Sequence, residues 1–419
     1  MVDATHAAPA PRQAALIFIF ITVALDVLAI GLIIPVLPAL VGSFFPGDSV
    51  SAAEMYGWFG TVFALMQFLA SPVLGALSDR FGRRPVILGS NLGLGIDYLV
   101  MAMAQSLPLL FIGRIVSGIT SASISTASAY IADVTTPEKR AASFGLIGAA
   151  FSLGFVIGPA VGGILGSVDP RLPFWVAAGL SLLNFAYGWL VLPESLPPAR
   201  RRPFEWRRAN PLGSLLWLKA HPQVFGLSGV VFLSQFAHVV FPAVFVLYAS
   251  HRYGWDERTV GFTLAAVGIC GAIVQGGLIR RVVPWLGERR ALLAGLGCGV
   301  LGFLWYGLAP SGHWFWLGIP VMALWGLAGP STQSLMTRQI DATEQGRLQG
   351  AVVGLAALTG IVGPYVYTHV YAASIAPERS WELPGAAFYL AALVLATAFL
   401  LAHRVAPSKA ELSTPSTHP

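Results

Sequence analysis

The chain has 419 residues, of which 56% are hydrophobic and only 11% are charged, and its mean hydropathy is +0.71. A soluble protein carries about 25% charged residues, so this composition excludes an ordinary soluble chain and predicts an all-α membrane protein. At about 20 apolar residues per crossing, this length accommodates roughly a dozen helices and leaves no room for a large soluble domain. The formal charge of +6 has to be interpreted from the positions of the charges.

Apolar runs separated by charged and turn-forming residues predict twelve transmembrane spans. These spans cover approximately residues 14–41, 52–77, 84–104, 107–131, 138–165, 171–192, 221–249, 256–281, 288–308, 313–335, 342–372 and 382–404. Pro35 and Pro38 should bend the first span.

The longest polar break lies near the middle of the chain and is rich in Pro and Arg. We therefore expect two six-helix bundles joined by a linker. The expected segments are a tail at 1–13, a first bundle at 14–192, the linker at 193–220, a second bundle at 221–404 and a tail at 405–419. The arginines of the linker are interpreted as contacts with anionic lipid headgroups rather than with nucleic acid.

Basic residues are distributed unevenly between the two sides of the membrane. If the N-terminus is cytoplasmic, 20 Lys and Arg residues fall on the cytoplasmic side and four on the other side. This asymmetry follows the positive-inside rule and predicts that both termini are cytoplasmic. The N-terminal apolar run is longer than the core of a signal peptide, so we expect it to be retained.

An internal repeat supports the division into two bundles. At a constant offset of 205 residues, Gly82 corresponds to Gly287, and the pair Gly158–Pro159 corresponds to Gly363–Pro364. Each Gly–Pro pair lies in the fifth span of its half. Duplicated halves are typical of secondary transporters, and the repeat predicts two pseudo-symmetric bundles.

Three ionisable residues, Asp26, Asp97 and Arg114, lie well inside predicted spans. A charge at the bilayer centre costs at least about 2.5 kcal/mol, so such residues suggest a function. Counting residues places both aspartates about 18 to 20 Å from the cytoplasmic side and Arg114 about 10 Å from the other side. The three residues then reach a common level and are candidates for proton and substrate binding. The structural alternative is a static Asp–Arg pair that fixes helix packing.

Neutral polar residues in other spans are weaker candidates for the wall of a cavity. They are Gln67 in the first half and Gln235, His238 and Gln333 in the second half. Taken singly, each is more often a packing residue than a ligand-binding one. His238 lies three residues after Gln235 and therefore on the same helix face.

Glycines form a stripe in the fifth span, where Gly154, Gly158, Gly162 and Gly166 follow one another at four-residue spacing. Such a stripe permits close approach of a neighbouring helix, and Pro159 adds a kink. We expect this helix to belong to an interface that seals and reopens.

A short charged turn, GALSDRFGRRPV at 75–86, joins the second and third spans. Its ion pairs form in one conformation and break in another if the turn acts as a gate. The candidate gate residues are Gly75, Asp79, Arg80, Gly82, Arg83 and Arg84.

Three segments together resemble motifs of the major facilitator superfamily. GALSDRFGRR at 75–84 resembles its loop between helices two and three, and LFIGRIVSGITSA at 110–122 resembles its helix-four motif with the buried arginine, here Arg114. GFVIGPAVGG at 154–163, which includes Gly163, resembles the helix-five motif of its antiporters. The resemblance implies the twelve-helix major facilitator fold.

Within that superfamily the chain resembles the bacterial tetracycline efflux proteins and related drug:proton antiporters. LDVLAIGLIIPVLP at 25–38 and GIDYLVMA at 95–102 carry much of this likeness. The resemblance implies that Asp26 and Asp97 handle substrate and protons. Those exporters also carry a helix-nine acid and a helix-eight histidine, whereas this chain has neither Asp nor Glu between Glu288 and Asp341, and no His between His251 and His313.

We therefore expect a proton-coupled exporter of a drug-like amphipathic molecule in the inner membrane of a bacterium, working as a monomer by alternating access. The alternative is a proton-coupled symporter that imports a small metabolite. No enzyme motif is found in the sequence, and we expect neither an enzyme, a cofactor, a bound metal nor a nucleic-acid partner. The expected partners are the drug, protons and the lipid bilayer.

Overall fold

The computed structural model describes residues 13–121, 123–135, 140–204, 217–341, 344–377 and 382–407. These residues are nearly all helical, and no strand occurs among them. The first half contains α1 (Gln13–Ile33), α2 (Leu37–Gly42), α3 (Ser49–Phe81), α4 (Arg83–Met103), α5 (Leu107–Thr120), α6 (Ser123–Val134), α7 (Arg140–Gly166), α8 (Leu172–Val191) and the short η2 (Pro198–Arg200). The second half contains α10 (Pro222–His238), α11 (Val240–Tyr253), α12 (Glu257–Ile273), η3 (Val274–Leu278), α13 (Ile279–Leu286), α14 (Glu288–Leu308), α15 (Gly312–Ala323), η4 (Leu324–Leu327), α16 (Ala328–Thr337), α17 (Gln345–Ser374) and α18 (Ala386–Val405).

Each predicted span corresponds to one helix or to consecutive helices in line. Nine helical stretches of the described chain are long and apolar enough to cross a membrane, and one of them, Pro222–Tyr253, joins α10 and α11. The first, fourth and tenth spans are divided into shorter helices, α1 with α2, α5 with α6, and α15 with η4 and α16. The all-α prediction with twelve spans is confirmed. The predicted tails at 1–13 and 405–419 lie almost wholly outside the described residues.

The helix breaks repeat between the halves at the offset found in the sequence. The break after α1, which contains Pro35, is matched by the break at Val239 between α10 and α11. The break after α5 is matched by η4. Gly82 and Gly287 also correspond in structure. Gly82 has a φ of 106° and precedes α4, and Gly287 has a φ of 79° and precedes α14. The repeat is therefore a repeat of backbone shape.

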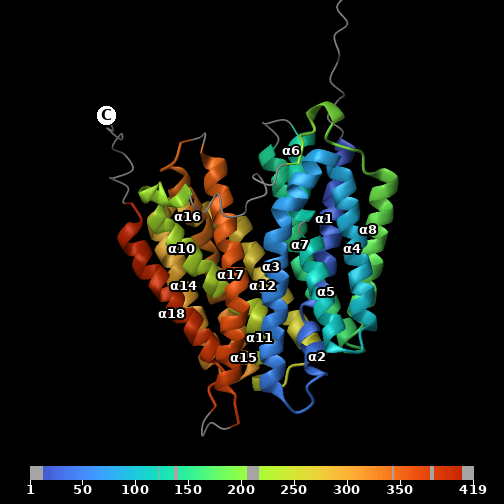
Figure 1. Ribbon diagram of the computed structural model, residues 1–419. Helices are drawn as coiled ribbons and strands as arrows, with labels where there is room; N and C mark the ends of the chain where they lie inside the picture. The colour runs from blue at the N-terminus through green and yellow to red at the C-terminus, as the bar shows by residue number, and fades with distance from the viewer. Residues whose placement is uncertain are drawn as a thin grey trace, which may run out of the picture.

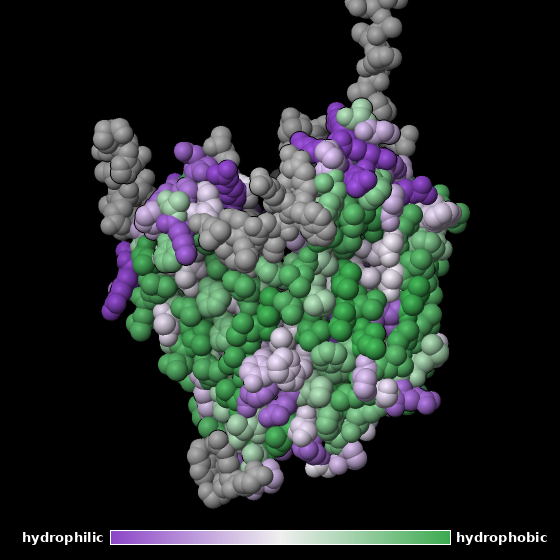
Figure 2. Space-filling model, viewed as in Figure 1, coloured by the Kyte–Doolittle hydropathy of each residue, from purple (hydrophilic) through white to green (hydrophobic). Residues whose placement is uncertain are grey.

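The helices of the two halves gather on opposite sides of the molecule (Figure 1). Buried residues of α10 to α18 form one large apolar cluster, while those of the first half form two others. Apolar side chains cover the middle of the visible surface, and hydrophilic ones gather toward its ends (Figure 2). Large apolar side chains such as Leu190 and Trp285 are 81% and 82% exposed, as expected of a surface that faces lipid.

Glycines bring helices of the two halves into close contact along two lines. A Cβ on Gly163 of α7 would overlap the carbonyl oxygen of Glu257 in α12, and one on Gly261 of α12 would overlap that of Pro159 in α7. On the other line, a Cβ on Gly60 of α3 would lie 2.9 Å from Pro364 of α17. Thr61 Oγ1 donates to Ile361 O over 2.9 Å on the same line. We call these lines, α7 with α12 and α3 with α17, the two seams.

Asp48 and Asp256 begin the seam helices α3 and α12 as N-caps. Asp48 accepts a hydrogen bond from Ser51 N at 3.0 Å, and Asp256 accepts one from Thr259 N at 2.9 Å. These bonds satisfy free backbone donors of the first turn. The pKa of both carboxyl groups is lowered below the usual range, first by the side chains of Ser51 and Thr259 and then by these backbone bonds, because both favour the charged form.

We expect Gly163→Ala to destabilise the protein by about 1–3 kcal/mol, because the added methyl group would overlap the Glu257 carbonyl of α12. The measurement is thermal unfolding of the purified protein in detergent. Gly148→Ala is the matched control, because Gly148 lies on the same helix with no atom within 4 Å of a Cβ. Equal unfolding temperatures for the two variants would contradict this account of the seam.

Candidate functional site

A cavity of about 880 Å³ lies between the two halves. Its wall consists mostly of apolar and aromatic side chains, together with a small number of polar groups. The polar residues are Tyr56, Gln67, Tyr98, Arg114, Ser117, Ser121, Ser234, Gln235, His238, Gln275 and Tyr306. Its size and its mixed wall are typical of a small-molecule site.

The halves meet at one end of the molecule and separate toward the other. Along α12, a Cβ on Gly268 would lie 2.7 Å from Val156 Cγ2 of α7, whereas one on Gly271 would meet only Gln275 Nε2, at 3.9 Å. Along α3, Gly60 is tight against Pro364, whereas a Cβ on Gly75 would meet nothing within 4 Å. The cavity therefore widens toward the end that carries the turn between α3 and α4.

Arg114 of α5 lines this cavity without a carboxylate partner. Its guanidinium lies 4.4 Å from the centre of the Phe63 ring. Its Nε is buried and has no hydrogen-bond partner among the described residues, and none of their carboxylates forms an ion pair with it. An unpaired buried donor is costly, so this wall is suited to an anionic or hydrogen-bond-accepting group.

Asp97 of α4 lies directly behind the cavity wall. Its Oδ2 accepts a hydrogen bond from Ser117, which lines the cavity, and its Oδ1 is buried without a partner in the described chain. A Cβ on Gly113 would lie 3.0 Å from that oxygen, so the carboxyl group lies against the backbone of α5. Ser117 lies one turn after Arg114 on α5, so its bond to Asp97 brings the carboxyl group near Arg114, although the two form no direct ion pair. The structure thus brings two of the three predicted buried charges to one place.

Asp26 of α1 lies in a separate polar cluster away from the cavity lining. Asn184 Nδ2 of α8 donates to Asp26 Oδ1 at 2.9 Å and to Thr22 O at 3.0 Å. The amide of Asn91 in α4, oriented with its nitrogen toward Asp26, lies 3.3 Å from both carboxylate oxygens. The carboxyl group is 6% exposed and holds three helices together. Neither asparagine was predicted from the sequence as a partner of Asp26.

The predicted neutral residues divide into two groups. Gln67, Gln235 and His238 line the cavity, and Gln67 Nε2 donates to Ser121 Oγ at 3.2 Å. Gln333 of α16 is absent from the cavity wall, and its Nε2 is buried without a described partner. It lies two turns beyond Trp325, so the helix carries it past the level of the cavity.

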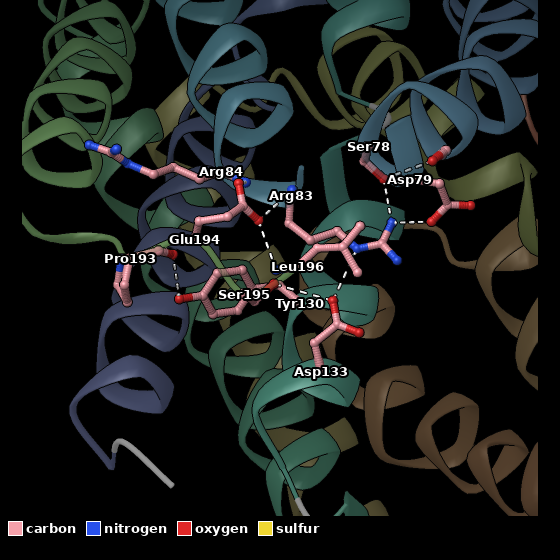
Figure 3. A network of polar contacts seen from close by, with 11 residues as sticks. Ser78, Asp79, Arg83, Arg84, Tyr130, Asp133, Pro193, Glu194, Ser195 and Leu196 are labelled. Atoms are coloured by element: carbon pink, nitrogen blue, oxygen red, sulfur yellow. Dashed lines mark hydrogen bonds and ion pairs between the residues drawn. The ribbon is translucent and has the colours of Figure 1, made fainter. Parts of the chain in front are cut away.

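The charged turn between α3 and α4 is organised around Arg83 (Figure 3). Its guanidinium forms ion pairs with Asp79 at 2.7 Å and with Asp133 of α6 at 3.1 Å, and it donates to Ser78 Oγ at 2.6 Å. Arg80 lies over the ring of Phe81, and Arg84 lies over Trp189. All partners of Arg83 found in the described residues belong to the first half, so these ion pairs do not cross to the second half.

Glu194, just after α8, fixes the start of α4 and was missed by the sequence analysis. Its carboxylate accepts hydrogen bonds from Arg83 N at 2.8 Å, Arg84 N at 3.3 Å and Leu196 N at 2.9 Å. A Cβ on Gly82 would overlap this carboxylate, and the φ of 106° at Gly82 is a conformation that favours glycine. The sequence does contain a signal for this role. An acidic residue follows the sixth span, which ends on the same side of the membrane as the α3–α4 turn.

The linker is attached to both halves. Arg202 N donates to Asp79 O at 3.0 Å. Trp217 Nε1 donates to Glu344 at the start of α17 over 3.2 Å, and this bond lowers the pKa of the Glu344 carboxyl group. Residues 205–216 lie outside the described part of the chain, and so do the predicted linker arginines Arg207 and Arg208.

We expect Glu194→Ala to destabilise the protein by about 1–3 kcal/mol, because two backbone donors at the start of α4 lose their acceptor. Glu194→Gln should cost less, since an amide oxygen still accepts one bond. Thermal unfolding of the purified variants measures the difference. Glu54→Ala is the control, because no described group bonds its carboxylate. The account fails if Glu194→Ala unfolds at the temperature of this control.

Comparisons with known proteins agree with this architecture. The family model described as "Major Facilitator Superfamily" matches residues 19–364. The chain is 42% identical to the tetracycline resistance protein, class C, of Escherichia coli over 90% of its own length and 95% of that protein. It is 37% identical to the class G protein of Vibrio anguillarum, over 91% and 96% respectively.

A solved structure, the human organic anion transporter MFSD10 (TETRAN), has a TM-score of 0.69 at 26% identity and covers 94% of this chain and 100% of that one. The range matched by the family model extends through both halves of the chain and covers the α3–α4 turn, α5 and α7. The chain belongs to the major facilitator superfamily, and it resembles the bacterial tetracycline resistance proteins within it.

Proposed function

We propose that this protein exports a drug-like amphipathic molecule, of the tetracycline class or another antibiotic, in exchange for protons by alternating access. The observation that carries the proposal is a cavity between the halves with an unpaired Arg114 in its wall and Asp97 directly behind it. The names of the relatives, tetracycline resistance proteins and an organic anion transporter, support the choice of substrate.

The distribution of charge supports an orientation in the membrane. The end that carries the α3–α4 turn also holds the basic residues of η2 and of the turn between α13 and α14, such as Arg200 and Arg289. By the positive-inside rule this end is cytoplasmic, and the membrane is the inner membrane of a bacterium. The seams are tight at the opposite end, which supports assigning this structure to a state that is open to the cytoplasm.

The two buried aspartates have different surroundings, which supports different roles. Asp97 has one unpaired oxygen next to a cavity-lining serine, so a proton bound there changes the charge that a substrate meets. Asp26 is surrounded by amide donors from α4 and α8. We assign proton coupling to Asp97 and the positioning of α1 to Asp26. Protonation of Asp97 from outside then favours return to the inward-open state.

We expect Asp97→Asn to abolish substrate-driven proton release, because an amide cannot bind and release the proton. Everted vesicles with an acidic interior are monitored with a pH-gradient dye while tetracycline or chloramphenicol is added outside. The unsubstituted protein should dissipate the gradient in exchange for at least one of these compounds. Asp26→Asn should lower the rate by about tenfold or less, as expected for loss of a positioning interaction worth about 1.4 kcal/mol.

Asp48→Asn is the control for loss of a carboxylate, because Asp48 lies outside the spans. Unchanged proton release in Asp97→Asn would refute the assignment. A symporter importing a metabolite would move its substrate and the proton in the same direction, and external substrate would then leave the gradient intact. That result would replace export by import as the function.

A further inference from the structure

Two segments that depart from α-helical geometry meet in the second-half wall of the cavity. η3, between α12 and α13, is a π-helix, and η4, between α15 and α16, is a 3-10 helix. They are in contact, since a Cβ on Gly326 of η4 would lie 3.5 Å from Val274 Cγ1 of η3. Such segments inside long helices often mark functional positions. Each contributes one cavity-lining side chain, Gln275 and Trp325.

Trp325 is held firmly by its neighbours. A Cβ on Gly299 of α14 would lie 2.9 Å from Trp325 Cγ, so the indole packs directly on the backbone of α14. Its ring centre lies 5.4 Å from that of Phe303 and 5.8 Å from that of His238. A fixed indole that borders a cavity offers a rigid surface for a ring of the ligand.

Two glycines next to these side chains leave the backbone uncovered. Gly329 lies one turn after Trp325, and Gly271 lies one turn before Gln275, so each pair shares a helix face. Both glycines line the cavity. A Cβ on Gly329 would meet nothing within 4 Å, and one on Gly271 would meet only Gln275 Nε2.

Close helix packing does not explain these two glycines. Other glycines of α12 and α14, such as Gly261, Gly268 and Gly295, all have a neighbouring atom that a Cβ would strike. Glycine inside a helix costs about 1 kcal/mol relative to alanine. Open space in front of Gly271 and Gly329 is instead suited to close approach of a ligand to the backbone.

Hydrogen-bonding groups border the same region. His238, at the end of α10, and Gln275 both have exposed side chains that line the cavity. Neither forms a side-chain hydrogen bond to another described residue. Their donors and acceptors are therefore available to a bound molecule.

We propose that Gly271, Gly329 and Trp325 form a slot that takes a flat ring of the transported molecule, with His238 and Gln275 bonding polar atoms on the edge of that ring. This proposal rests on the proposed export function and assigns specificity to residues of spans 7, 8 and 10. The ligand class is a planar ring system with oxygen or nitrogen atoms on its edge. Bulk added at either glycine excludes the ring, while compact acyclic groups elsewhere in the cavity are unaffected.

The test fills the slot without disturbing the fold. Gly329→Leu and Gly271→Leu each place a side chain in open space. Gly179→Leu is the matched control. Gly179 of α8 is exposed, has nothing within 4 Å of a Cβ and lies outside the cavity wall. Binding of tetracycline and of the planar dye ethidium to purified protein is measured by equilibrium dialysis. We expect at least about tenfold weaker binding in the two slot variants, a loss of about 1.4 kcal/mol, and less than about twofold change in the control.

A second pair of variants tests the aromatic surface. Trp325→Phe keeps an apolar ring but reduces its area, and we expect about three- to tenfold weaker binding of the same probes. Trp316→Phe is the control, since Trp316 is 42% exposed on the outer surface.

The possible outcomes separate the slot from the export function. Unchanged binding in both glycine variants, with normal binding in the unsubstituted protein, would overturn the slot and leave export in place. Binding of neither probe by the unsubstituted protein, together with no substrate-driven proton release, would overturn both.

Discussion

Close backbone contact through glycine is the constraint on which the structure depends. α7 lies between α1 and α12, and it has glycines on both faces. Gly158 and Gly162 approach α1, while Gly163 approaches α12. Dispersion contacts at this distance are individually weak but numerous. Because glycine has no side chain, the two helix backbones come close enough to make these contacts directly. The first half is thereby joined to the second along a helix that also contains Pro159.

The same contacts determine where the cavity lies. Because the seams are tight at one end and open beyond Gly268 and Ala64, the halves form a wedge, and the space inside it is lined by the broken spans. The breaks in spans 1, 4, 7 and 10 direct side chains into the cavity that a continuous helix would direct elsewhere. In the proposed alternating-access cycle, a rigid-body change of the wedge would alter access to the cavity without requiring the core of either half to repack.

Part of this arrangement was predictable from the sequence, and the reason is local. Proline and glycine determine backbone shape at their own positions, so Pro35, Gly82 and the Gly–Pro pairs indicated the breaks and the repeat. The helix ranges followed from hydropathy. The partners of Asp26 were not predictable, because Asn91 and Asn184 lie in other spans and one sequence does not show how helices are rotated against each other. The π-helix η3 also left no signal, since one extra residue in a turn does not change an apolar pattern.

The chain has no Asp or Glu between Glu288 and Asp341, and the packing of α14 disfavours an acidic side chain on its inner face. Its inner face is occupied by Gly295 and Gly299, which lie against Ala328 and Trp325, so a charged side chain there would displace the ring that borders the cavity. A second buried charge would also add at least about 2.5 kcal/mol of desolvation cost. Among the described residues, Arg114 and Asp97 place charged groups at the wall formed by α4 and α5, whereas the opposite wall carries aromatic side chains and His238. In the proposed mechanism, a proton on Asp97 and a ring at Trp325 would then act on each other through the charge state of the cavity and the movement of the seams.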